Sequence, residues 1–284
     1  MKTQTIAYIS IATTISMAQA AVLVSDNFDD LADGTDMASS ANWNAKWDGN
    51  NETQRNLYKG NGNGSVTLDT TVAWRNYHAL HQTGFQVGGA DGHDSVTISS
   101  DISYVHAAGG DISANLNEAF FGLFVSNTAP WWSGGGNANS ESLLLANRGA
   151  AVGNKVNGSP WIEDWTNHSS LGVDTSTGGE SSTINIAWTL SDNGTTIDAA
   201  AVITRGGSTF ETTLVDTTLA SGSTLYGGYS TGWNGVGNVP ISDVNAIESV
   251  TIDNFSISAP DAVPEPSSVI LASLAALGLL RRRR

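Results

Sequence analysis

The chain contains no cysteine and few basic residues, and each shortage limits what the protein can be. Without cysteine there are no disulfides and no thiol chemistry, so an exported fold depends on its hydrophobic core or on bound metal ions. Residues 21–260 contain 25 acidic and only 7 basic residues, which gives this segment a net charge of −18. Because a surface this acidic repels phosphate groups, we expect no nucleic-acid partner.

Helix-forming residues are also scarce, and the residues in their place favour strands and turns. Ser, Thr, Asn, Asp and Gly are interleaved with Val, Ile and aromatic residues along most of the chain. No long stretch has a helical period of 3.6 residues. The sequence therefore predicts an all-β fold, a two-sheet antiparallel β-sandwich. Its expected strands are residues 21–28, 65–69, 95–105, 119–126, 183–190, 196–204, 208–215 and 249–258.

Two features suggest how these strands are connected. Asn193-Gly194 lies between two strand patterns and is typical of a tight hairpin, and a second hairpin is expected through Arg205-Gly206-Gly207. The two ends of the domain also echo each other, as Asp26-Asn27-Phe28 and Asp253-Asn254-Phe255. The arrangement resembles concanavalin A-like or LamG-like jelly rolls. That resemblance implies first and last strands that lie side by side and close the domain.

Both ends of the chain look like targeting segments. Lys2 precedes an apolar run, and Ala18-Gln19-Ala20 offers small residues to a signal peptidase, so we expect residues 1–20 to form a cleaved signal helix. Near the other end, residues 269–280 form a short hydrophobic helix of about 18 Å, against about 30 Å of membrane hydrocarbon. The arginines that follow favour the cytoplasmic side, which leaves the preceding chain outside the inner membrane.

The segment 261–284 resembles the PEP-CTERM sorting signal of Gram-negative bacteria, through Val-Pro-Glu-Pro-Ser-Ser, an apolar stretch and a terminal arginine cluster. The resemblance implies processing by an exosortase after transient anchoring in the inner membrane, and then delivery to the outer surface or extracellular matrix. It also implies an association with extracellular polysaccharide. The implied recognition motif is Pro264, Glu265 and Pro266, and the implied stop is Arg281, Arg282, Arg283 and Arg284. Residues 21–260 remain as the β-sandwich domain.

The residues indicate no catalytic site. None of the glutamates begins the Glu-x-Asp-x-x-Glu pattern that places catalytic carboxylates on one strand face. Gly228-Tyr-Ser230-Thr-Gly232 matches the serine-hydrolase elbow, but the glycine-rich residues after it cannot easily form the helix that the elbow requires. We therefore expect a loop there, and a protein that is not an enzyme.

Tryptophan and acidic residues supply the candidate binding groups. Seven tryptophans lie in turn-rich segments, where they either stack on sugar rings or anchor loops: Trp43, Trp47, Trp131, Trp132, Trp161, Trp165 and Trp233. Asp26, Asn27 and Asp253 converge if the terminal strands pair. There they either hold a structural Ca²⁺ or remain solvated acids at strand ends.

Together these features favour a non-catalytic, exported β-sandwich that binds or structures extracellular polysaccharide. One alternative is a polysaccharide-degrading enzyme, a glycoside hydrolase or lyase, on the same fold. The other is a purely structural or adhesive matrix protein.

Overall fold

The computed structural model describes eleven segments of the chain, which belong to one compact unit, Val22–Ala259, and its immediate ends. The segments are residues 20–47, 58–68, 76–106, 119–128, 140–146, 149–155, 164–169, 181–205, 208–214, 217–233 and 247–260. The predicted signal helix and the predicted hydrophobic helix of the sorting tail lie outside these segments and stay predictions.

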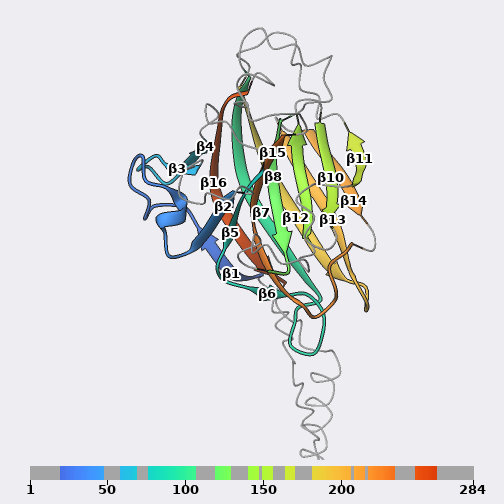
Figure 1. Ribbon diagram of the computed structural model, residues 1–284. Coiled ribbons are helices and arrows are strands. Elements are labelled where there is room, and N and C mark those ends of the chain that lie inside the picture. The colour runs from blue at the N-terminus through green and yellow to red at the C-terminus, as the bar shows by residue number, and fades with distance from the viewer. Residues whose placement is uncertain are drawn as a thin grey trace, which may run out of the picture. The chain divides into compact units, whose positions relative to one another are not determined.

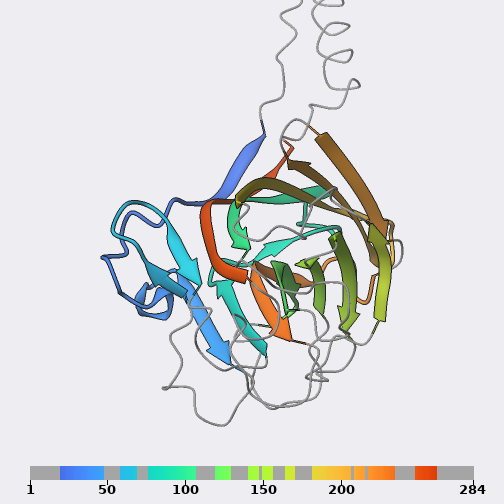
Figure 2. The same cartoon turned by 90° about the horizontal axis from the view of Figure 1, so that it is seen from above.

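Two antiparallel sheets of eight strands each lie over one another (Figures 1 and 2). In the first sheet the strand order is β14-β13-β12-β7-β16-β4-β3, and β1 also pairs with β16. The bounds of these strands are β1 Ala21–Asp26, β3 Tyr58–Gly60, β4 Val66–Leu68, β7 Ser95–His106, β12 Ser181–Asp192, β13 Ile197–Arg205, β14 Ser208–Leu214 and β16 Ile247–Ala259.

The second sheet has the strand order β11-β10-β9-β8-β15-β5-β2, and β6 pairs with β15. Its strands are β2 Trp43–Trp47, β5 Asn76–His81, β6 Phe85–Gln86, β8 Ala119–Ser126, β9 Ser140–Ala146, β10 Gly149–Lys155, β11 Asp164–Ser169 and β15 Thr224–Trp233. A single turn of 3-10 helix, η1 (Met37–Ser39), precedes β2, and the side chain of Asp36 caps it.

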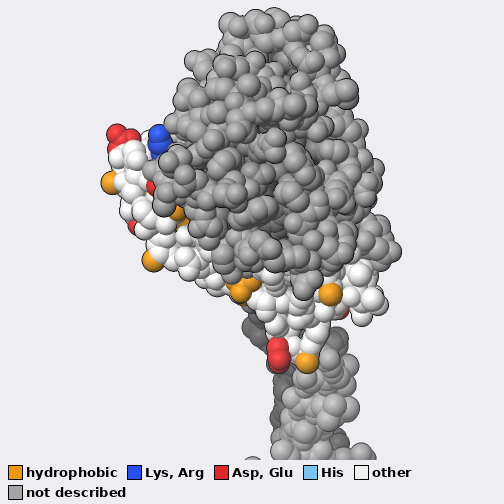
Figure 3. All heavy atoms as spheres, in the orientation of Figure 1, with side chains coloured by type: hydrophobic (Ala, Val, Ile, Leu, Met, Phe, Trp, Pro, Cys, Tyr) orange, Lys and Arg blue, Asp and Glu red, His pale blue; other side chains and the backbone are white. Residues whose placement is uncertain are grey.

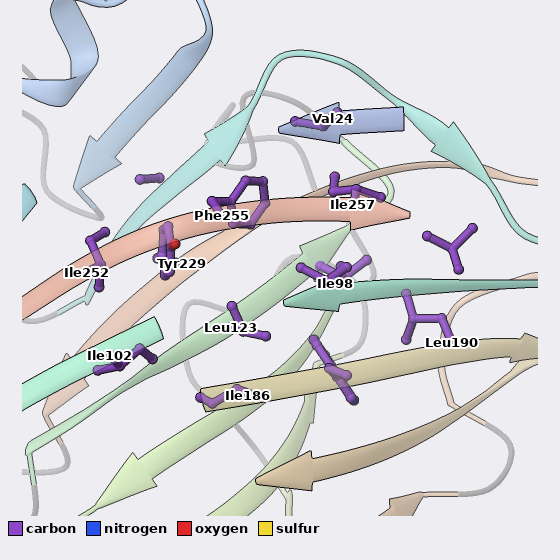
Figure 4. Packing of buried hydrophobic residues seen from close by; sticks show 14 of the residues in the cluster. Val24, Ile98, Ile102, Leu123, Ile186, Leu190, Tyr229, Ile252, Phe255 and Ile257 are labelled. Atoms are coloured by element: carbon purple, nitrogen blue, oxygen red, sulfur yellow. The ribbon is translucent and has the colours of Figure 1, made fainter. Parts of the chain in front are cut away.

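The hydrophobic core lies between the two sheets and follows the alternation of side chains along each strand. In β12, for example, Ile184, Ile186, Trp188 and Leu190 are fully buried, whereas the residues between them face outward. Figure 4 shows Ile98, Ile186 and Ile257 of the first sheet facing Leu123 and Tyr229 of the second. Burial of aliphatic and aromatic side chains between the sheets is what holds this cysteine-free fold together.

The prediction of a two-sheet antiparallel sandwich is confirmed, and all eight predicted strands are present. Both predicted hairpins are also present, since β12 pairs with β13 and β13 pairs with β14. Gly194 in the first hairpin turn has φ of +94°, a conformation that glycine adopts without strain. The pairing of β1 with β16 confirms that the first and last strands lie side by side.

One sequence prediction about local structure is wrong. Residues 228–232, expected as a loop because of their glycines, lie inside strand β15. Gly228 is needed there because a Cβ atom would collide with the carbonyl oxygen of Ala79 on the neighbouring strand β5. Gly228 therefore permits close strand approach instead of a turn.

Candidate functional site

A buried aromatic and polar cluster joins the two sheets around Trp43. The Trp43 side chain is only 1% exposed, and its indole Nε1 donates a hydrogen bond of 2.7 Å to Oδ2 of Asp26. The other carboxylate oxygen of Asp26 accepts a bond of 2.8 Å from the backbone N–H of Phe28. Asp26 thus has a hydrogen-bond partner for each oxygen, which accounts for its burial in an apolar setting.

The repeated Asp-Asn-Phe sequence supplies two walls of this cluster. Phe28 packs against Trp43 with ring centroids 5.7 Å apart, and Phe255 packs against the same indole at 5.0 Å. Each copy contains a residue with positive φ, Phe28 at +55° in the first and Asn254 at +52° in the last. Both copies therefore turn the backbone so that a phenylalanine enters the core.

His81 closes the cluster from strand β5. Its ring meets Trp43 edge to face at 5.2 Å, and its Nδ1 accepts a hydrogen bond from the backbone N–H of Thr83. The neutral ring consequently carries its proton on Nε2. Burial lowers the pKa of His81 below its ordinary value of 6.5, and the nearby carboxylate of Asp26 opposes this shift only in part.

Because the folded state holds His81 neutral, stability is expected to depend on pH. The unfolded chain binds this proton more readily than the folded chain, so stability is complete above pH 6.5 and falls as the pH drops from 6.5 toward the folded-state pKa. Urea unfolding should give a lower midpoint in mildly acidic buffer than in neutral buffer. His81→Gln should flatten this difference, and an equally large difference in that variant would show that His81 is not its source.

A chain of hydrogen bonds connects the buried cluster to a β-bulge in strand β16. The Tyr229 ring lies against Trp43, and its hydroxyl bonds Oγ of Ser100 at 2.7 Å. Ser100 in turn donates to the backbone carbonyl of Asp253 at 2.9 Å. The register between β16 and β7 shifts between Asp253 and Ser256, so the carbonyl that Ser100 holds lies at this bulge. Bulges re-aim side chains, and here two successive polar residues face outward.

On the outer surface of the sheet, beside the bulge, the carboxylate of Asp101 is held between two side-chain amides. Oδ1 of Asp101 accepts a bond of 2.8 Å from Nδ2 of Asn185 on one side. Its Oδ2 accepts a bond of 2.9 Å from Nδ2 of Asn254 on the other side. Asp253 lies directly opposite Asp101 in the ladder between β16 and β7. The bulge therefore gathers two carboxylates and two amides on the outer surface of the first sheet.

Hydroxyl groups extend this arrangement over what we call the polar face, the outward side of the adjacent strands β4, β16, β7, β12, β13 and β14. Pairs of hydroxyls on adjacent strands bond each other: Ser99 with Ser256 at 2.7 Å, Thr97 with Thr189 at 2.9 Å, Ser103 with Thr183 at 2.9 Å, and Thr67 of β4 with Thr251 at 3.3 Å. These bonds restrict the rotamers of the side chains, so the polar face is ordered before any ligand arrives.

One row of the polar face crosses five adjacent strands. The ladder registers place Asp253, Asp101, Asn185, Thr204 and Thr209 opposite one another in turn, and we call these five residues the central row. All five side chains are partly or fully exposed. Figure 3 shows one face of the molecule, where acidic and hydrophobic side chains of the described surface lie at separate points.

The structure corrects one of the predicted sugar-stacking residues. Trp43 is buried between the sheets and cannot present its ring to a glycan. The other six predicted tryptophans have no described side chain. Trp47, Trp165 and Trp233 lie in strands β2, β11 and β15 by their backbone, and Trp131, Trp132 and Trp161 lie outside the described residues.

The predicted calcium ligands are only partly brought together. Asp26 points into the core and Asn27 is exposed, while Asp253 lies at the bulge and accepts from the N–H of Asn254. Among the described side chains, no group of three or more His, Asp or Glu residues could hold a metal ion. Structural Ca²⁺ at these residues stays a prediction. It can be tested by comparing the unfolding midpoint in added Ca²⁺ with the midpoint in a chelator.

The predicted sorting residues, Pro264, Glu265, Pro266, Arg281, Arg282, Arg283 and Arg284, also lie outside the described segments. Within those segments, no helix has the length and apolar character needed to cross a membrane.

Asp101, Asn185 and Asn254 were not among the residues predicted from sequence. The signal for them is faint, because alternate Ser, Thr, Asn and Asp positions occur on many exposed strands.

Comparison with solved structures finds similarity to seed lectins and to a pseudo β-1,3-glucanase. The seed lectin of Lotus tetragonolobus is 13% identical with a TM-score of 0.46, and the match covers 84% of this chain and 99% of the lectin. Peanut lectin is 13% identical with a TM-score of 0.47, over 87% of this chain and all of the lectin. An immunostimulatory antigen and pseudo β-1,3-glucanase of Mycobacterium tuberculosis is 13% identical with a TM-score of 0.44, over 84% and 98% of the two chains.

Comparison of sequences gives a match at the sorting tail only. No curated protein matches the chain significantly. Residues 262–284 match the family described as the PEP-CTERM protein-sorting motif, which agrees with the resemblance seen in the sequence. The chain thus carries a PEP-CTERM sorting motif, which implies an exported protein that an exosortase processes.

Proposed function

We propose that residues 21–260 form a non-catalytic β-sandwich that binds or structures extracellular polysaccharide after export. The observation that carries this proposal is the ordered polar face, with Asp101 held between Asn185 and Asn254 and flanked by bonded hydroxyl pairs. Polysaccharides present rows of hydroxyl groups that can exchange hydrogen bonds with such a surface. Because the protein side chains are already fixed, little rotamer freedom is lost on binding.

Charge supports a matrix location as well. The acidic domain repels nucleic acids that are released into the matrix. Its surface charge also keeps it soluble outside the cell. The sorting motif supplies the route to the envelope or matrix. Fractionation of cells into membrane, surface and released material tests this location, and protein confined to the cytoplasm would contradict it.

A glycan-array experiment combined with a hydrolysis assay tests the proposed function. We expect binding to one or more polysaccharides without product release. Asp101→Ala combined with Asn185→Ala should weaken binding by about tenfold or more, since two hydrogen-bonding partners worth about 1 kcal/mol each are lost. The same urea midpoint as in the parent chain would show that the fold survives.

The matched control is Asp91→Ala, which removes an exposed carboxylate from the loop after β6. This variant should bind as the parent does. Loss of binding in the control alone would place the ligand elsewhere, and release of sugar products by the parent chain would favour the alternative of a polysaccharide-degrading enzyme.

A further inference from the structure

Taking the proposed function as given, we infer that the central row binds an extended glycan that carries amino groups, laid across the strands with about one sugar per strand. The spacing and the charge of the row are two separate observations that support this inference.

The spacing follows from the ladder registers. Asp253, Asp101, Asn185, Thr204 and Thr209 come from five consecutive strands, β16, β7, β12, β13 and β14. Neighbouring strands lie about 4.8 Å apart, so the row presents one polar side chain at that interval over about 19 Å. This interval is close to the length that one hexose adds to an extended β-linked chain. A glycan crossing the strands would therefore meet a polar side chain at each sugar.

Small apolar side chains lie beside the central row. In the next row of the same face, Ala187 pairs with Val202, and Val202 is 39% exposed. The C–H surface of a sugar ring can rest on such groups while its substituents reach the polar row. Binding sites for small ligands commonly combine apolar contact with a few fixed polar groups.

Charge distinguishes between classes of glycan. The described outward residues of the first sheet include the carboxylates of Asp101, Asp253, Asp198 and Glu211. Lys59 on β3 lies at the far edge of the sheet, where the carboxylate of Asp36 faces it. The row therefore attracts protonated sugar amines and repels uronic acids.

The test uses two probes with the same β-1,4 backbone, the pentamer of glucosamine and the pentamer of N-acetylglucosamine. Binding of each to the full chain is measured by calorimetry in mildly acidic, low-salt buffer, where the free amines are protonated. We expect the glucosamine pentamer to bind about tenfold more tightly, because several exposed charge pairs contribute up to about 1 kcal/mol each. Added salt should reduce this preference.

Variants then locate the site. Asp101→Asn with Asp253→Asn keeps the shape of the row, and it should abolish the preference for the amine-bearing probe. Asp91→Asn removes a charge away from the row and should keep the preference. Affinity should also rise with oligomer length up to about five sugars, one per strand of the row, and then level off.

Each outcome has a distinct meaning. Equal binding of the two probes, or tighter binding of the acetylated one, would overturn this inference and leave glycan binding intact. An undiminished preference in the double variant would also overturn it, because the charges would then lie elsewhere. If the chain binds neither probe nor any polysaccharide of the array, the proposed function fails as well.

Discussion

Replacing Trp43 with alanine is expected to lower the free energy of unfolding by about 3–5 kcal/mol, the usual cost of emptying a large buried aromatic site. The indole is buried between the sheets and contacts the rings of Phe28, His81, Tyr229 and Phe255. The substitution also removes the N–H donor from the buried carboxylate of Asp26, which adds about 1–3 kcal/mol. Since native proteins are stable by only about 5–15 kcal/mol, the variant should lose much of its stability and unfold at a far lower urea concentration than the parent.

Trp43→Phe keeps one aromatic ring in the core, and it removes the N–H donor together with the smaller part of the indole. Its urea midpoint should fall between those of the parent and the alanine variant. If Trp43→Ala unfolds at the urea concentration of the parent, the ring does not join the sheets as described.

Replacing Glu265 with alanine is expected to leave the protein uncleaved and held in the membrane fraction. Glu265 lies between two prolines within the matched sorting motif, shortly before the hydrophobic segment. If an exosortase recognises Pro-Glu-Pro, loss of the carboxylate removes the central element of its recognition site. The expected result is full-length chain in membranes and little processed protein outside, measured by immunoblotting of cell fractions.

Asp261→Ala is the matched control, since it removes a carboxylate that lies just outside residues 262–284. This variant should be processed as the parent is. Release of the Glu265→Ala chain at the normal rate would contradict a role for this residue in sorting.

The strands that the sequence predicted share a clear physical signal. Residues 95–105 and 183–190 alternate between core and solvent, and this alternation survives in the structure as β7 and β12. Asn193-Gly194 predicted its hairpin because only a few residues tolerate the backbone of such a turn. Where the signal is local, sequence was sufficient.

Strands β2, β3, β5, β6, β9, β10, β11 and β15 were not predicted. They are short, rich in glycine or asparagine, or dependent on partners distant in sequence, as Gly228 of β15 depends on Ala79 of β5. Such strands form because tertiary pairing overrides local propensity. Tertiary packing likewise buries His81, which is 6% exposed and lies against Trp43.

The candidate site could be predicted only in part. The repeat of Asp-Asn-Phe pointed to the two places where the terminal strands meet, but it suggested metal ligands. The structure instead assigns the first aspartate to an indole N–H and the second to a bulge. Asp101 gave no signal of its own, because its importance arises from amides 84 and 153 residues away in the chain.

The pairing of β1 with β16 also affects how the chain folds during export. In the part of the chain that the structure describes, the first strand, residues 21–26, pairs with residues 247–259, so this edge of the sheet cannot close until nearly the whole domain has been synthesised. Closing such a long loop costs chain entropy, and folds dominated by distant contacts form slowly. A chain that folds late stays unfolded for longer and can cross a membrane in that state. This suits an exported protein whose sorting tail is the last part of the chain to reach the membrane.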